Sequence, residues 1–340
     1  MSKTDSQFIW STLNPQFLEL VLMPTEQCNF RCVYCYEDFS IGKMSPRVQA
    51  ALKRFLEVRI KDLKHLSLQW FGGEPLAAKS IIYELSAFVQ KLCLDHGVSF
   101  GGALTTNGYL LDARVVRELF DFGQRGYQIS LDGMEDAHNS TRKLVSGAGT
   151  FERIWANLKA IRESSLEVSV LIRVHLTPDN TQSIKALAKV LRTEFLHDSR
   201  FSVLLKPIEN LGGPNSSNIV TLNKAVRAEL LSEIRSELYC DKPQATKPRT
   251  TVEEACYASR PNSFVIRADG RVQKCTVALS EAHNTVGHLA DDGSIRLDRE
   301  LMGHWMRGYG TGNLRELRCP AQYFPGSVEH KELIPVALIS

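Results

Sequence analysis

Three cysteines lie within eight residues near the start of the chain and constrain it more than any other feature. Cys28, Cys32 and Cys35 have the spacing C-x3-C-x2-C, so one loop can hold three thiolates around one corner of a cubane-sized iron–sulfur cluster. The next cysteine, Cys93, is too far along the chain to belong to that loop. One iron is therefore left without a protein ligand, and a small chelating molecule can bind to it.

Zinc is the alternative metal for this triplet. Structural zinc usually takes four ligands, commonly from two paired arms, and no second arm follows Cys35 closely. Cys93 lies in an apolar helical pattern and is expected to be a buried helix residue. The other four cysteines all come after position 239. This uneven grouping favours metal ligation over disulfide bonds.

The composition limits the location and the partners of the protein. The 340 residues carry a net charge of +3 and no run of five or six like charges, which argues against a nucleic-acid-binding arm. Residues 1–7 lack the basic and apolar regions of a signal peptide, and no apolar stretch is long enough to span a bilayer. We therefore expect a cytoplasmic protein with no nucleic-acid or membrane partner.

Short apolar runs alternate with longer helical patterns over the first two thirds of the chain, which predicts βα units and a parallel sheet. Strands are expected at 18–23, 66–71, 99–104, 127–131, 167–175 and 201–205. Helices are expected at 45–63, 79–96, 112–122, 151–164 and 181–196, with one more ending near 238. Six strands favour an open, partial barrel with its chemistry at the carboxyl ends of the strands.

The expected strand ends carry further motifs. Gly72-Gly73-Glu74-Pro75 follows the second strand, Thr105-Thr106-Asn107-Gly108 ends the third, and Ser130-Leu131-Asp132-Gly133 ends the fourth. With the cysteine triplet, these segments resemble the radical S-adenosylmethionine (SAM) superfamily. The resemblance implies an α/β fold, a partial (β/α)6 TIM-like barrel, in which Cys28, Cys32 and Cys35 hold a [4Fe-4S] cluster and the open iron holds SAM.

The resemblance also implies which residues surround SAM. Gly72, Gly73 and Glu74 would receive the SAM ammonium, because glycines permit close approach and carboxylate or carbonyl oxygens accept hydrogen bonds. Ser130 and Asp132 would bond the ribose hydroxyls. The alternatives are a plain βα turn at the glycines and capping of the next segment by Asp132.

Three more SAM contacts follow from the same resemblance. Arg142 would grip the SAM carboxylate with two parallel bonds. The stretch around it is similar to the family's HD-x3-R pattern, except that Asn139 stands where Asp is usual. His138 is expected to be a structural hydrogen-bonding residue. Tyr34 would lie beside the adenine, and Leu205 would close the other side of the ring.

A second group of cysteines has the spacing Cys256-x13-Gly270-x4-Cys275. Residues 264–272 between them predict a hairpin with an Asp-Gly turn that brings the two thiols together. This pattern, with the strand expected at 286–289 and with Cys319, resembles the SPASM and twitch domains that hold auxiliary iron–sulfur clusters.

The second group departs from the full SPASM pattern, because Gln322 stands where another cysteine is usual and none follows. One auxiliary cluster, expected to be [4Fe-4S], is then implied, with Cys256, Cys275 and Cys319 as ligands. The fourth ligand is Cys240, a non-cysteine side chain, or absent. Zinc, or scattered buried cysteines, are the alternatives.

These patterns divide the chain into an N-terminal extension, a radical SAM barrel and a twitch/SPASM-like cluster domain, at residues 1–17, 18–239 and 240–340. The resemblance implies an oxidoreductase that generates a 5′-deoxyadenosyl radical and matures a ribosomally synthesised precursor peptide through a thioether, carbon–carbon or similar crosslink. It also implies an electron donor such as flavodoxin or ferredoxin. Because residues 1–17 are too short for a leader-recognition domain, we expect the precursor to be held by the barrel, by the twitch region or by a separate leader-binding protein.

Two alternative functions stay open. One is a radical SAM dehydrogenase or epimerase that acts on a small molecule or a peptide. The other is an iron–sulfur binding or sensor protein without turnover, against which the Gly72-Gly73-Glu74 segment and Arg142 argue. Thr276 stands where sulfatase maturases carry Asp, which weighs against that activity. The sequence assigns no catalytic acid or base.

Overall fold

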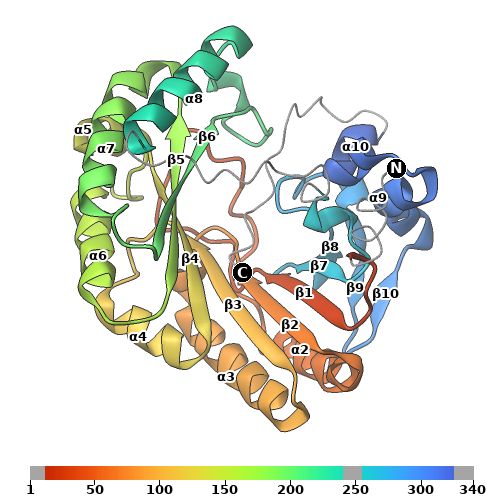
Figure 1. Ribbon diagram of the computed structural model, residues 1–340. Coiled ribbons are helices and arrows are strands. Elements are labelled where there is room, and N and C mark those ends of the chain that lie inside the picture. The colour runs from red at the N-terminus through yellow and green to blue at the C-terminus, as the bar shows by residue number, and fades with distance from the viewer. Residues whose placement is uncertain (1–11, 240–254, 325–340) are drawn as a thin grey trace.

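The structure is a computed structural model that describes residues 12–239 and 255–324. One sheet runs through both ranges, in the strand order β10-β9-β8-β7-β1-β2-β3-β4-β5-β6. It curves strongly, and helices cover its outer side (Figure 1). The expected open, partial barrel is confirmed, since the six strands β1 to β6 are parallel neighbours in chain order.

All six expected strands are present, each within three residues of the bounds expected from the sequence. They are β1 (Phe17–Leu22), β2 (His65–Trp70), β3 (Ser99–Thr106), β4 (Gln124–Leu131), β5 (Ser169–Leu176) and β6 (Phe201–Pro207). The strands are buried on both faces over much of their length, as parallel sheets with covered faces require. Leu20, Ile129 and Ile172 are completely buried in the single large core.

The helices that follow these strands are α2 (Pro46–Arg59), α3 (Lys79–His96), α4 (Ala113–Asp121), α5 (Glu135–Thr141), α6 (Phe151–Glu163), α7 (Thr181–Glu194) and α8 (Lys224–Tyr239). Helix α2 starts where Ser45 accepts a hydrogen bond from the Val48 N–H, and α3 ends at Gly97 in the left-handed region (φ 65°). Helix α5 was not predicted, because seven residues give too little periodicity to recognise.

The C-terminal range continues the sheet. Strand β7 (Ser263–Ile266) lies parallel to β1, and β8 (Arg271–Gln273) and β9 (Thr285–Leu289) extend it as antiparallel strands to β10 (Ile295–Leu297). Helices α9 (Arg299–Thr311) and α10 (Leu314–Arg318) follow. The predicted Asp-Gly hairpin is confirmed as the β7–β8 turn, where Gly270 has φ 88°. The strand expected at 286–289 is β9.

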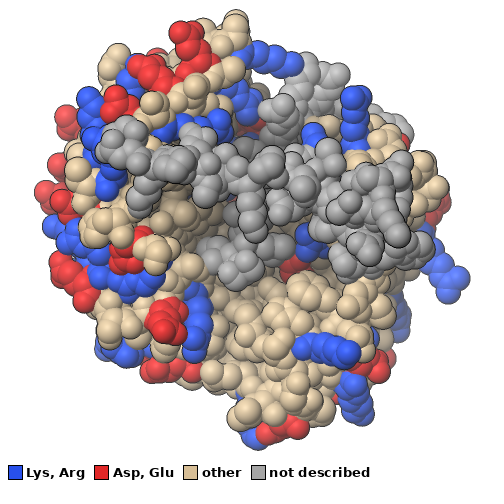
Figure 2. All heavy atoms as spheres, in the orientation of Figure 1, with Lys and Arg blue, Asp and Glu red and all other residues tan. Residues whose placement is uncertain are grey.

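Short 3-10 helices complete the described elements, at Ile60–Asp62, Pro75–Ala78, Pro178–Asn180, Ser216–Asn218, Tyr257–Ser259, Ala282–Asn284 and Pro320–Tyr323. Among the described residues, no helix has the length and apolar character that crossing a bilayer would need. Acidic and basic side chains are interspersed on the described part of the face in Figure 2.

Candidate active site

A cavity opens at the carboxyl ends of the parallel strands. The loop after β1 and the ends of β2 to β6 all contribute to its wall. The polar and thiol groups lining it come from Cys28, Cys32, Tyr34, Cys35, Tyr36, Glu37, Thr105, Thr106, Asn107, Ser130, Arg142, Arg173, His175, Lys206 and Glu209. The apolar and glycine residues are Phe30, Phe71, Gly72, Gly73, Pro207, Ile208 and Leu211. The predicted rim is thus a single concave site.

The cysteine loop presents all three thiols to this cavity. Burial raises the pKa of the Cys28 and Cys35 thiols to about 12, so without a metal both are protonated at neutral pH. The Phe30 N–H points at the Cys28 sulfur at 3.3 Å and opposes this shift. Backbone N–H groups aimed at sulfur are a feature of iron–sulfur sites, where the metal displaces the thiol protons.

The two glycines after β2 are needed because this loop presses against the loop after β1. Gly72 has φ 128°, a conformation that other residues rarely adopt. A Cβ atom at Gly73 would lie 2.6 Å from the carbonyl oxygens of Glu26 and Gln27. Both glycines line the cavity, so their bare backbone is open to a ligand.

Glu74 does not line the cavity, in contrast to its expected contact with the SAM ammonium. Its carboxylate is completely buried and accepts hydrogen bonds from the Leu76 N–H (3.0 Å), the Thr106 hydroxyl (2.7 Å) and the Asn107 N–H (2.7 Å). Burial raises the pKa of Glu74, and these donors oppose the shift. Glu74 therefore joins the loop after β2 to the end of β3.

Asp132 is also placed behind the cavity wall and not in it. Its carboxylate accepts hydrogen bonds from the hydroxyls of Tyr34 and Thr141, both at 2.7 Å, and lies 3.2 Å from His175 Nδ1. Burial alone would raise the pKa of Asp132, but the hydrogen bond from His175 and the charge of Arg142 outweigh burial and hold it well below its usual range. Asp132 thus orients Tyr34 and His175, whereas Ser130 faces the cavity.

Arg142 lies in the cavity wall, where the sequence predicted it. The end of α5 places it there, and its Nη1 donates to the Tyr34 hydroxyl at 2.8 Å. Its Nε atom is buried and has no hydrogen-bond partner among the described residues. His138 is structural as expected, since it is completely buried and contacts Thr150 Oγ1 at 3.0 Å.

Arg173 is a site residue that the sequence reasoning missed. It lies on β5 opposite Ser130, lines the cavity, and has a buried Nε without a hydrogen-bond partner among the described residues. The available signal was a single arginine in the apolar run 170–174. A cation inside an otherwise apolar strand needs a partner, and the strand end is where a ligand provides one.

Leu205 does not line the cavity, in contrast to the expected adenine contact. It packs with Val203 against residues of α7 and α8, such as Ile184 and Ile234. The next residue, Lys206, lines the cavity. Because side chains alternate along a strand, the cavity face of β6 belongs to Lys206 and not to Leu205.

The second cysteine group also converges. The Cys256 N–H donates to the Leu317 carbonyl at 2.9 Å, near Cys319, and the Tyr257 hydroxyl accepts from the Thr276 N–H at 2.8 Å, beside Cys275. Burial raises the pKa of Cys256 and Cys319, and the charge of Cys275 adds to both shifts. The three segments that carry Cys256, Cys275 and Cys319 therefore lie next to one another.

The nature of any metal at these thiols stays a proposal. Within residues 12–239 and 255–324, no three His, Cys, Asp or Glu side chains are arranged around one metal ion. Cys240, the possible fourth ligand, lies outside the described residues.

Known proteins similar to this chain point to one family. The family profile described as "Radical SAM superfamily" matches residues 22–191. The serine-type anaerobic sulfatase-maturating enzyme of Klebsiella aerogenes is 26% identical over 44% of this chain and 37% of its own length. A GTP 3′,8-cyclase of Microcystis aeruginosa is 25% identical over 74% of this chain and 78% of its own length.

Several of these sequence similarities are partial. The alignments with the sulfatase-maturating enzymes of Klebsiella and with the GTP 3′,8-cyclase of Aliarcobacter butzleri span only 37% to 51% of those relatives. Solved structures share the fold over more of the chain. "Native anSMEcpe with bound AdoMet" has a TM-score of 0.65 at 19% identity, over 86% of this chain and 82% of that one. Streptococcus suis SuiB bound to precursor peptide SuiA has a TM-score of 0.61 at 15% identity, over 88% and 69%.

Proposed function

Because the chain belongs to the radical SAM superfamily, we propose that it uses a cluster and SAM in this cavity to modify a ribosomally synthesised precursor peptide. The observation that carries the proposal is the meeting of three thiols and two arginines, Arg142 and Arg173, in one cavity. Each arginine has a buried Nε without a partner among the described residues, which suits a ligand that carries a carboxylate.

The residues present fit the cofactors of the family. Cys28, Cys32 and Cys35 would hold a [4Fe-4S] cluster, and the bare backbone at Gly72 and Gly73 leaves room for the SAM ammonium. Cluster and SAM together would supply a 5′-deoxyadenosyl radical able to abstract a hydrogen atom from a substrate.

The chain's own residues would bind and orient SAM. Arg142 and Arg173 would grip the SAM carboxylate, and Ser130 would bond the ribose. Asp132 holds the Tyr34 hydroxyl, which fixes the aromatic ring at the cavity wall. Phe30, Phe71 and other apolar residues of the wall would help exclude water from reactive species.

A peptide substrate is supported by the fold shared with a protein solved with its precursor peptide bound. The cavity also borders the second cysteine group, because Tyr36 lines it and donates to the Thr276 carbonyl at 3.0 Å. We propose that Cys256, Cys275 and Cys319 hold one auxiliary cluster in a C-terminal domain and that the product is a thioether, carbon–carbon or similar crosslink. An electron donor such as flavodoxin or ferredoxin, and a separate leader-binding protein, belong to this proposal.

A small-molecule substrate is the second candidate. The similarity to a GTP 3′,8-cyclase that covers 74% of this chain favours a nucleotide over other small molecules. Cyclisation, dehydrogenation or epimerisation would then replace peptide crosslinking.

Anaerobic incubation of the cluster-reconstituted protein with SAM and dithionite tests the proposal. Candidate precursor peptides and GTP are added separately, and 5′-deoxyadenosine and product masses are measured by mass spectrometry. Loss of two hydrogens from a peptide supports a crosslink, whereas turnover of GTP alone supports the second candidate. Cys35→Ala is the control without SAM cleavage. Absence of 5′-deoxyadenosine from the unaltered protein under every condition would show that neither candidate is right.

A further inference from the structure

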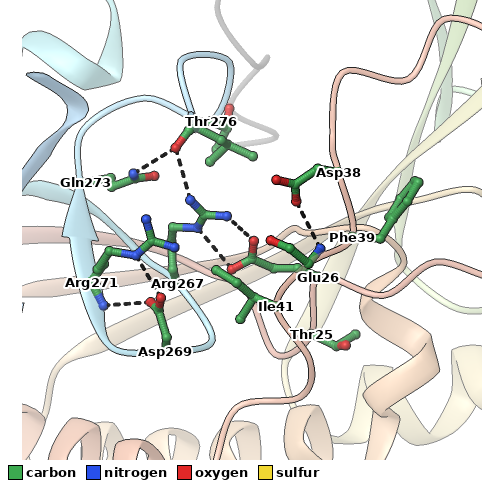
Figure 3. Close-up of polar contacts among 12 residues, drawn as sticks. Thr25, Glu26, Asp38, Phe39, Ile41, Arg267, Asp269, Arg271, Gln273 and Thr276 are labelled. Atoms are coloured by element: carbon green, nitrogen blue, oxygen red, sulfur yellow. Dashed lines mark hydrogen bonds and ion pairs between the residues drawn. The ribbon is translucent and has the colours of Figure 1, made fainter. Parts of the chain in front are cut away.

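A buried ion pair joins the cysteine loop to the C-terminal hairpin. Arg267, directly after β7, donates from Nε to Glu26 Oε1 at 3.0 Å and from Nη2 to Glu26 Oε2 (Figure 3). Its Nη1 donates to the Leu279 carbonyl at 3.0 Å. Arg267 is only 6% exposed and Glu26 only 2%. The guanidinium fork therefore fixes the orientation of Glu26, which is two residues before Cys28.

The other end of the loop is attached to the same hairpin region. Tyr36, next to Cys35, donates its hydroxyl to the carbonyl of Thr276, next to Cys275. The triplet thus lies between two contacts with residues 267–276. The loop that follows β1 is positioned by the C-terminal part of the chain as well as by its own barrel.

Arg267 also faces more than one acid. Its charge acts on Glu37 and Asp38, which follow Cys35, in addition to Glu26. Glu26 is the one of these three acids that is hydrogen-bonded to Arg267 among the described residues. Removal of Arg267 would leave Glu26 buried without a compensating charge, which is a far larger disturbance than loss of an exposed ion pair.

We propose that Arg267 is a positioning residue for the cluster site: it holds the start of the cysteine loop through Glu26 and offsets negative charge beside the three thiols. This inference rests on the proposed function in one respect, that a cluster and SAM occupy the cavity. The C-terminal hairpin then has a role in SAM binding that is separate from any auxiliary cluster.

The two members of the pair have opposite electrostatic effects. Reduction adds an electron to the cluster, so a nearby positive charge favours the reduced state and a nearby negative charge disfavours it. Arg267→Met should lower the midpoint potential of the cluster at Cys28, Cys32 and Cys35. Glu26→Gln should raise it. Both variants lose the two-pronged ion pair, so both should weaken SAM binding.

Full-length, cluster-reconstituted variants test this inference. Arg267→Met, Arg267→Lys and Glu26→Gln are compared with Arg271→Met, which removes an exposed ion pair with Asp269 (2.7 Å) from the same hairpin (Figure 3). Redox titration followed by electron paramagnetic resonance gives the midpoint potential, and anaerobic calorimetry gives the SAM dissociation constant. Iron content and circular dichroism report on assembly and folding.

We expect a SAM dissociation constant about 10- to 100-fold higher for Arg267→Met, as for other residues that orient metal ligands. Arg267→Lys should lie between this value and that of the unaltered protein, because lysine keeps the charge but not the fork. Arg271→Met should change neither quantity.

Three outcomes would overturn the inference. They are an unchanged affinity and potential in Arg267→Met, shifts of the same sign in Arg267→Met and Glu26→Gln, and equal shifts in Arg271→Met. If Arg267→Met does not fold, Glu26→Gln and Arg267→Lys still decide the question. Failure of the unaltered protein to bind SAM would instead contradict the proposed function. The cluster potentials of the unaltered protein and the variants could still be compared, so the two failures are distinguishable.

Discussion

At the scale of single residues, the arginine that the barrel presents from β5 is the sharpest marker of what the cavity binds. Arg173→Met removes a cation whose Nε has no partner among the described residues. A hydrogen bond to a charged group contributes about 1.5–3 kcal/mol, so SAM affinity should fall about 10- to 100-fold. Anaerobic calorimetry of the reconstituted protein measures this. Arg125→Met, on the exposed part of β4, is the control, and equal affinities for both variants would exclude Arg173 from the SAM site.

Glu74 should act on stability more than on ligand contact. In Glu74→Gln an amide NH2 replaces one carboxylate oxygen and faces a backbone or hydroxyl donor, so one buried group loses its hydrogen bond. The cost should be about 1–3 kcal/mol of unfolding free energy. Urea unfolding of the metal-free chain checks it. Glu84→Gln breaks an exposed pair with Lys53 and should cost less than about 1 kcal/mol. Equal costs would mean that Glu74 does not join the two loops.

The predicted site residues that line the cavity are mainly those fixed by local spacing. Three thiols in one short loop must lie close together, and glycines beside a strand end mark a close backbone approach. Asp132 and Glu74 lie behind the cavity wall, because their hydrogen-bond partners come from distant segments such as His175 and Asn107. No spacing rule reveals such partners, and a buried acid looks the same in sequence as an acid that faces a ligand.

At the scale of elements, the close packing of the β1 and β2 loops should make Gly73 intolerant of any side chain. In Gly73→Ala the new Cβ would lie 2.6 Å from two carbonyl oxygens, so the backbone must shift. We expect a loss of about 1–3 kcal/mol in unfolding free energy and lower iron content after reconstitution. Gly42→Ala, with no atom within 4 Å of its Cβ, is the control. Normal iron and stability in Gly73→Ala would contradict the close packing.

Helices were predictable where their hydrophobic pattern extends over many residues. The α3 bounds agree with the sequence prediction because eighteen periodic residues end at a glycine. The seven-residue α5 was missed, although it carries Arg142 to the cavity. The position of β6 was predicted, but Lys206 lines the cavity and Leu205, the expected adenine contact, does not. A strand buried on both faces has no polar alternation to show which side chains point inward.

At the scale of the whole molecule, one sheet links the barrel to the C-terminal hairpin through β1 and β7. The sequence predicted the hairpin but not that it would continue the barrel sheet, because parallel pairing between residues far apart leaves no local pattern. This pairing places Arg267 of the C-terminal hairpin beside Glu26 of the cysteine loop. Residues far apart in the sequence therefore both position the cysteine triplet.

Buried histidines should make the stability of the whole metal-free chain depend on pH. Burial lowers the pKa of His175 to about 4 and that of His138 to about 3, below the value of about 6.5 for an unfolded histidine. Below about pH 6.5 the unfolded chain therefore binds protons that the folded chain does not. Stability is fully present above that pH and falls on acidification towards pH 4, by about 1.4 kcal/mol per pH unit for each histidine.

Urea unfolding of the metal-free protein between pH 7.5 and 4.5 measures this slope. In His175→Asn the contribution of one histidine to the pH dependence of the unfolding free energy is lost, because asparagine does not titrate in this range. The slope due to the two buried rings should therefore fall by about half. His96→Asn, at an exposed helix end, is the matched control. A slope that is equal in His175→Asn and in the unaltered chain would mean that His175 is not held neutral behind the cavity. Asp132 would then keep Tyr34 in place without it, and the network that shapes this wall would be smaller than the structure indicates.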